Sequence, residues 1–147
     1  MVVRFFSALG WITLIFSMVV FLVSYASFPQ EVLVLVDGVG QPQLYVEKGT
    51  LFYSLLAFAM LINAMAIGIK GVIKNHESTE LMQISIHVSQ MFFNMFFASS
   101  VYFINILNSR ENFDYSNFGY LIYITGGLMV ISIIFTFFSK MIPKKFN

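Results

Sequence analysis

The chain contains no cysteine among its 147 residues, and only 10% of its residues are charged. The lack of cysteine excludes disulfides, thiolate metal sites and cysteine nucleophiles, although it leaves the cellular compartment open. Soluble domains carry about 25% charged residues, so this chain has too few to cover a water-facing surface. The formal net charge is +1 and no basic face is concentrated anywhere, which argues against nucleic-acid binding.

Long stretches of the chain carry no charge at all. They are residues 5–30, 49–69, 81–109 and 115–139. A helix rises about 1.5 Å per residue, so roughly 20 apolar residues cross a hydrocarbon core of about 30 Å, and every stretch reaches that length. We therefore predict an all-α membrane protein, an antiparallel bundle of transmembrane helices forming one domain over residues 1–147. The helices are expected over about 5–28, 50–73, 81–107 and 117–142.

The first apolar stretch has a second interpretation as a signal peptide. Arg4 provides a positive N-terminal region, and Ser24-Tyr25-Ala26 resembles a cleavage site with small residues. The stretch is long for the apolar part of a signal peptide, so a retained membrane helix is the favoured interpretation.

Lysine and arginine are unevenly distributed between the two sides of the predicted bundle. One side holds Arg4, Lys70, Lys74, Lys140, Lys144 and Lys145. The other side holds Lys48 and Arg110. Basic residues near helix ends favour the cytoplasmic side, so we predict that both termini are cytoplasmic.

The loop over residues 29–49 has the pattern of a β-hairpin. Residues 32–36 are apolar and largely β-branched, Asp37-Gly38 is a turn signal, and residues 44–46 can form the returning strand. An isolated hairpin is marginally stable in water, so it must pack on the bundle or on a partner chain. We expect it to lie over the outer ends of the helices.

The same loop resembles a known family. In order, it contains Phe28-Pro29, Val32, Val36-Asp37, Gly40, Pro42, Tyr45 and Lys48. This spacing is similar to a segment between the first two helices of the toxin-immunity proteins of the sporulation-delaying-protein system and of their bacterial relatives. The resemblance covers about residues 20–70. Leu33 and Leu35 stand where the family has proline and histidine, so no role of that histidine is carried over.

The resemblance implies a non-enzymatic protein of the bacterial inner membrane whose loop faces outward. Its candidate loop residues are Pro29, Asp37, Gly40, Pro42, Tyr45 and Lys48. General physical reasons suit three of them. Gly40 allows a positive φ at a turn, Pro42 removes a backbone donor from an exposed edge, and Lys48 can extend its stem along the interface.

The third predicted helix carries a stripe of polar residues at helical spacing. We consider five of them candidate partner- or ligand-binding residues: Gln83, His87, Gln90, Asn94 and Asn105. Asn108 continues the stripe. Polar side chains in lipid face the protein interior or a cavity. They can hydrogen-bond other helices, at about 0.6 kcal/mol per contact, or face another protein or a ligand. Asn63 is the only comparable residue in the second predicted helix, so the stripe has more polar side chains than the packing of a small bundle requires. A partner outside the chain is therefore an alternative to internal packing.

His87 could bind a metal ion or relay a proton. The chain's other histidine, His76, lies outside the apolar stretches, and no carboxylate accompanies His87 within them. Proton pumps and coupled transporters place such charged groups in the membrane. A hydrogen-bonded structural histidine is therefore favoured, and we expect no metal site, no cofactor and no catalytic constellation.

Small residues recur along three helices. Gly10, Ser17 and Ser24 repeat every seven residues, and Ala64 lies four before Gly68. Gly71 follows one turn later, and the last helix contains Gly119, Gly126, Gly127, Ser132 and Ser139. Such positions let a neighbouring backbone come close, so they predict helix packing within the bundle.

Three functions remain open. The first is a small binding or accessory subunit of a larger inner-membrane assembly. The second is a small transporter or a channel-like oligomer, and the third is a toxin-immunity-like membrane protein. The expected partners are the lipid bilayer and either other membrane subunits or further copies of this chain, without nucleic acid.

Overall fold

Four long helices and one small sheet make up the computed structural model, which describes residues 1–37, 41–75, 80–109 and 115–139 (side chains excepted for 73–75 and 115–118). The elements are α1 (Val2–Ser27), β1 (Glu31–Val36), β2 (Pro42–Glu47), α2 (Lys48–Asn75), α3 (Glu80–Leu107) and α4 (Tyr115–Ser139). All four helices are long and apolar enough to cross a membrane, as in a multi-pass membrane protein. The predicted helices are confirmed within a few residues, and the expected end of the last one at 142 lies outside the described residues.

The helix α1 ends where the sequence predicts. Phe28 caps it with an extended backbone, φ −65° and ψ 139°. A proline disfavours the helical region for the residue before it, so Pro29 explains this conformation. The chain leaves α1 here and enters β1 directly.

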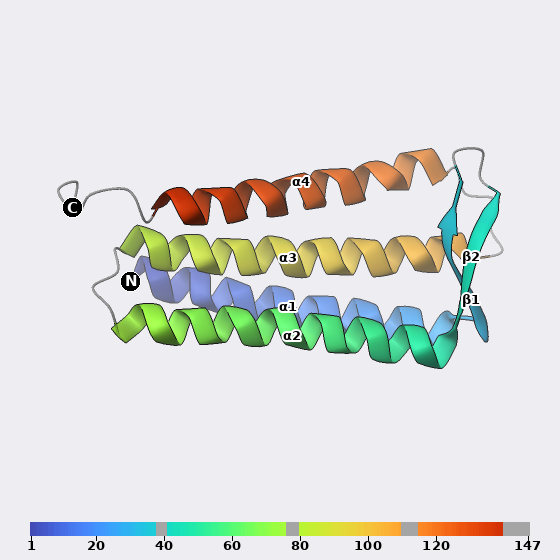
Figure 1. Ribbon diagram of the computed structural model, residues 1–147, viewed down its shortest axis with the longest axis horizontal. Helices are drawn as coiled ribbons and strands as arrows, with labels where there is room; N and C mark the ends of the chain where they lie inside the picture. The colour runs from blue at the N-terminus through green and yellow to red at the C-terminus, as the bar shows by residue number, and fades with distance from the viewer. Residues whose placement is uncertain (38–40, 76–79, 110–114, 140–147) are drawn as a thin grey trace.

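The two strands form the predicted hairpin, with Val32 opposite Val46 and Leu33 opposite Tyr45 in an antiparallel ladder. The hairpin lies across one end of the helices, which we call the hairpin end (Figure 1). Val32 is 0% exposed and belongs to a core cluster with Phe28, Phe97 and Val101. The hairpin therefore packs on the bundle through β1, as its marginal intrinsic stability requires.

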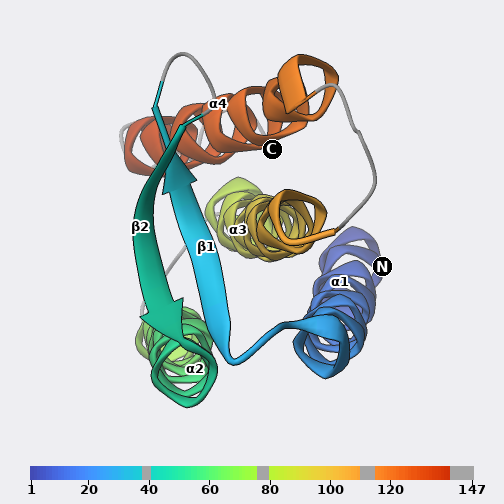
Figure 2. The ribbon, with the colours of Figure 1, turned by 90° about the vertical axis from the view of Figure 1, so that its right-hand side faces the viewer.

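The helix α3 occupies the centre of the molecule. Figure 2 shows α1, α2 and α4 arranged around it. Half of the residues in the most apolar stretch of α3 are buried, against 11% to 17% in the other three helices. The least apolar helix is thus the one that its neighbours shield, which is where membrane proteins place polar side chains.

Consecutive helices run in opposite directions (Figure 1). The start of α1 and the end of α4 lie together at the end opposite the hairpin, which we call the terminal end (Figure 1).

The predicted packing of small residues is confirmed for α1 and in part for α4, where Gly127 is exposed. The buried positions of α1 include Gly10, Ser17 and Ser24, the residues that repeat every seven. A Cβ atom at Gly10 would lie 3.5 Å from Oε1 of Gln90, an ordinary contact distance, so α1 and α3 lie close together at this position. On α4 the buried polar residues include Ser132 and Ser139.

The corresponding prediction for α2 is wrong. Ala64, Gly68 and Gly71 are exposed. A Cβ atom at Gly68 or at Gly71 would meet nothing within 4 Å in the described part of the chain. Small residues do share one face of α2, but their spacing alone does not show which face of the helix its neighbours cover.

Candidate functional site

Three side-chain amides join α2 to the middle of α3. Nε2 of Gln90 donates to Oδ1 of Asn63 at 2.8 Å. Nδ2 of Asn63 donates in turn to Oδ1 of Asn94 at 3.2 Å and to the carbonyl oxygen of Ala59 at 2.9 Å. All three amides are buried, and Asn94 is only 1% exposed. The chain thus provides internal partners for Gln90 and for Oδ1 of Asn94, the centre of the predicted stripe, while Nδ2 of Asn94 is buried without a partner among the described residues.

Lys70 extends this network, and sequence reasoning missed it. Its ammonium donates to Oε1 of Gln90 from a half-buried position on α2. In the sequence analysis Lys70 enters only as a charge near a helix end. Its signal was available, because Lys70 lies seven residues after Asn63 and therefore on the same face of α2.

Hydroxyl pairs join α3 to α4 at three levels. Ser85 pairs with Ser139 at 3.2 Å, and Ser89 pairs with Thr136 at 3.0 Å. A third pair, Ser99 with Thr125, lies at 2.9 Å nearer the hairpin end. Of these six residues, only Ser139 is among the small residues that the sequence singles out. A serine or threonine in an apolar helix commonly bonds its own backbone, so its position in the sequence does not indicate a partner on another helix.

At the hairpin end the polar stripe contacts α1 and β1. The hydroxyl of Ser27 donates to Oδ1 of Asn105 at 2.6 Å. Asn108 accepts from the Leu33 amide at 2.8 Å and donates to the Leu33 carbonyl at 2.9 Å. The Asn108 side chain therefore pairs with β1 as a neighbouring strand would, and it satisfies an edge that would otherwise be unpaired.

Two of the predicted loop residues hold the hairpin in place. The Lys48 ammonium donates to the carbonyl of Phe28 at 2.8 Å and lies 4.7 Å from the centre of the Tyr25 ring. Asp37 closes the far end, where Oδ1 accepts from the Gln41 amide at 2.7 Å. These contacts make Lys48 and Asp37 structural residues of the hairpin.

The remaining predicted loop residues differ from these two. Pro29, Pro42 and Tyr45 are exposed, and Gly40 lies outside the described residues.

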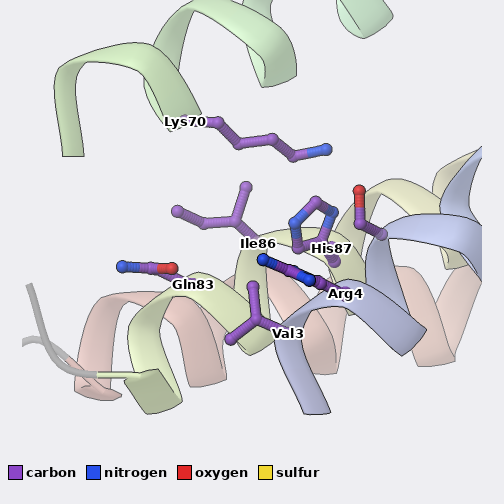
Figure 3. Close-up of a pocket in the computed structure, with 7 residues that line it drawn as sticks. Val3, Arg4, Lys70, Gln83, Ile86 and His87 are labelled. Atoms are coloured by element: carbon purple, nitrogen blue, oxygen red, sulfur yellow. The ribbon is translucent and has the colours of Figure 1, made fainter. Parts of the chain in front are cut away.

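A pocket of about 450 Å³ opens at the terminal end of the bundle. Three helices line it: α1 through Val3, Arg4 and Ser7, α2 through Lys70, and α3 through Gln83, Ile86 and His87 (Figure 3). His87 is only 8% exposed, and its Nδ1 atom is without a hydrogen-bond partner among the described residues. The structure thus brings two predicted residues, Gln83 and His87, together with two cations.

The predicted stripe is divided among three environments. Gln83 and His87 lie at the pocket, Gln90 and Asn94 lie in the amide network, and Asn105 lies at the hairpin end. Within the described residues no group of three or more histidine, aspartate or glutamate side chains could hold a metal ion. The chemistry that this arrangement offers is hydrogen bonding and positive charge at the pocket. Comparison of the chain with protein-family models, with curated proteins and with solved structures finds no match to any of them.

Proposed function

We propose that this protein is a non-enzymatic membrane protein that acts as a binding or accessory subunit of a larger assembly in a bacterial inner membrane. The observation that carries the proposal is the outward face of α2. Small side chains lie exposed there at helical spacing, at Ala57, Ala64, Gly68 and Gly71. No other part of the described chain covers Gly68 or Gly71.

This face suits a transmembrane helix of another subunit. In lipid there is no hydrophobic gain from bringing two helices together, so association depends on close backbone packing and on interhelical hydrogen bonds. Small residues allow that approach. Large apolar side chains are exposed on α1, α2 and α4 alike, such as Phe16, Leu61 and Phe137, but on α2 the small side chains share one stripe between them. Gln90, Asn94, Asn105 and Asn108 on α3 each have at least one partner inside the chain, although Nδ2 of Asn94 has none among the described residues. This moves the expected partner surface from the polar stripe to α2.

The experiment compares two glycines in equivalent open positions. Gly68 on α2 and Gly127 on α4 both lack any neighbour within 4 Å of a Cβ atom. Replacing either with leucine should leave the isolated protein folded, since leucine is the better helix former by about 0.6–1 kcal/mol. We expect Gly68→Leu to remove the protein from its assembly in native membranes, measured by size under native electrophoresis, and Gly127→Leu to leave the assembly intact.

The absence of cysteine permits a second measurement on the same face. Gly71→Cys and Gly127→Cys each introduce the only thiol of the chain. Cross-linking in native membranes should join the α2 thiol to a different chain in a product of one defined mass, and should leave the α4 thiol unreacted. A product of twice the mass of this chain would indicate self-association. It would favour a channel-like oligomer over an accessory subunit. Equal behaviour of both thiols, or no product, would reject the proposal.

A further inference from the structure

The pocket at the terminal end lies at a defined depth along the helices. Arg4 lies two residues from the start of α1, and Lys70 lies five residues from the end of α2. At about 1.5 Å per residue, both Cα atoms are within roughly 8 Å of the helix ends. α2 and α3 each contain 28 residues, or about 42 Å, so each exceeds a hydrocarbon core of about 30 Å by several ångströms at both ends. In a bilayer the pocket would lie where headgroups meet the hydrocarbon.

The lining of the pocket is cationic and rich in hydrogen-bond donors. Figure 3 shows Lys70 and Arg4 extending into the pocket from opposite sides, with the His87 ring beside them. No carboxylate is among the described residues that line it. A guanidinium presents a fork of N–H groups that fits two phosphate oxygens, and an ammonium has three donors, so the Lys70–Gln90 bond leaves two for a ligand. These features favour an anion over a metal ion.

The buried histidine gives a second, independent indication. An imidazole that is more than nine-tenths buried with an unpartnered nitrogen carries a cost, because a polar atom away from water should be hydrogen-bonded. Its Nδ1 faces the side where α1 approaches, 4.0 Å from the position of a Cβ atom on Gly10. Nδ1 has almost no solvent-accessible area in this structure, so a ligand in the pocket becomes its partner only when the His87 ring turns toward the pocket that it lines.

We propose that this pocket binds a phosphate group, held by Arg4 and Lys70 from two helices and oriented by Ser7 and His87. Its volume of about 450 Å³ is within the usual range of about 300–1,000 Å³ for ligand pockets, and it exceeds what a phosphate alone requires. A headgroup phosphate of an anionic lipid, with its glycerol, fits this volume and depth. A soluble phosphate has the same chemistry and would enter from the aqueous side.

The test uses the full chain, purified and delipidated in detergent. In the first arm, native mass spectrometry follows the retention of added phosphatidylglycerol and, in parallel, of zwitterionic phosphatidylcholine. In the second arm, inorganic phosphate is titrated against the protein in phosphatidylcholine nanodiscs while the thermal unfolding midpoint is measured. We expect one retained phosphatidylglycerol per chain and weaker retention of phosphatidylcholine. A midpoint that rises with inorganic phosphate, without selective lipid retention, would assign the site to a soluble phosphate.

Two variants connect the binding to the pocket. Arg4 is exposed at the start of α1, so Arg4→Gln should keep the fold, and Lys70→Gln removes the second cation. Each should weaken retention by roughly tenfold, as expected for the loss of one charge-assisted hydrogen bond. Lys48→Gln removes the same charge at the hairpin end and should leave retention unchanged. The unfolding midpoint of each ligand-free variant shows whether it is folded. Failure of both phosphate probes to bind folded protein, or equal loss in all three variants, would overturn the proposal.

Discussion

Asn63 and Gln90 meet between α2 and α3, where Nε2 of Gln90 donates to Oδ1 of Asn63 at 2.8 Å. Because Asn63 also donates to Asn94, one residue of α2 serves two residues of α3. Lys70 adds a further contact to Gln90 from the same face of α2. The small-residue face of α2 points away from α3. These polar contacts therefore hold α2 against α3, whereas small residues contribute to the packing of α1 and α4 on α3.

The first prediction is that Asn63→Leu destabilises the protein. The change leaves Nε2 of Gln90 and Oδ1 of Asn94 without their partners in a buried position. An unsatisfied buried group costs about 1–3 kcal/mol, although hydrogen bonds between membrane helices average about 0.6 kcal/mol. We expect a loss of about 1–2 kcal/mol in the free energy of unfolding, measured by denaturation in mixed micelles.

The triple variant Asn63→Leu, Gln90→Leu, Asn94→Leu provides its control. Replacing all three amides with apolar groups removes their unsatisfied atoms, and this can be nearly neutral. The Lys70 ammonium loses its contact with Gln90, but it is only half-buried and lines the open pocket, where water can replace that contact. The triple variant should therefore be more stable than Asn63→Leu alone. If the triple variant is less stable than Asn63→Leu, the hydrogen bonds among the amides contribute net stability beyond the avoidance of unsatisfied buried groups.

The second prediction separates two adjacent glycines on α4. A Cβ atom at Gly126 would lie 3.3 Å from the Phe96 ring, whereas one at Gly127 would meet nothing within 4 Å. Gly126→Leu should lower the free energy of unfolding by about 1–3 kcal/mol through overpacking. Gly127→Leu should not lower it. Thermal unfolding in detergent measures both, and identical midpoints would mean that Phe96 moves aside without cost.

The third prediction concerns the attachment of the hairpin. Asn108 both accepts from and donates to Leu33, so Asn108→Leu frees the outer edge of β1. We expect faster hydrogen exchange at the Leu33 amide by about five- to thirtyfold, the equivalent of about 1–2 kcal/mol. Gln43→Leu, at an exposed position on β2, is the control and should leave that exchange rate unchanged. Unaltered exchange in Asn108→Leu would mean that Val32 alone anchors the strand.

The fourth prediction is the orientation in the membrane. The distribution of lysine and arginine predicts cytoplasmic termini and an outward-facing hairpin. A reporter that is active only outside the cytoplasm should be active when inserted at Gly38 and silent when fused after Asn147. The opposite pattern would invert the topology and would also move the phosphate pocket to the outer surface.

Local features of this protein could be predicted from the sequence because they depend on short-range physics. The length of an apolar stretch sets the length of a membrane helix, so all four helices were expected. The end of α1 follows from the steric effect of Pro29 on Phe28. The hairpin follows from β-branched residues beside a turn, and the buried face of α1 follows from its seven-residue repeat.

The candidate site could be predicted only in part. The polar stripe on α3 identified Gln83 and His87, but nothing in their spacing indicated Arg4 or Ser7 as neighbours, because these lie on another helix. Lys70 shares a face of α2 with Asn63, and that spacing could have indicated its contact with Gln90. The family resemblance of the loop stays a prediction, although Asp37 and Lys48 have clear structural roles within it.

By itself the sequence determined which segments are helices, where they end and which of them carries polar side chains. Only the tertiary structure decided that α3 lies at the centre, that the small face of α2 is uncovered, and that Arg4, Lys70 and His87 meet in one pocket. The physical reason is that apolar helices present similar surfaces to one another and to lipid. Hydrophobicity therefore does not determine which helices are neighbours. Close packing and a few hydrogen bonds between residues distant in the chain determine it.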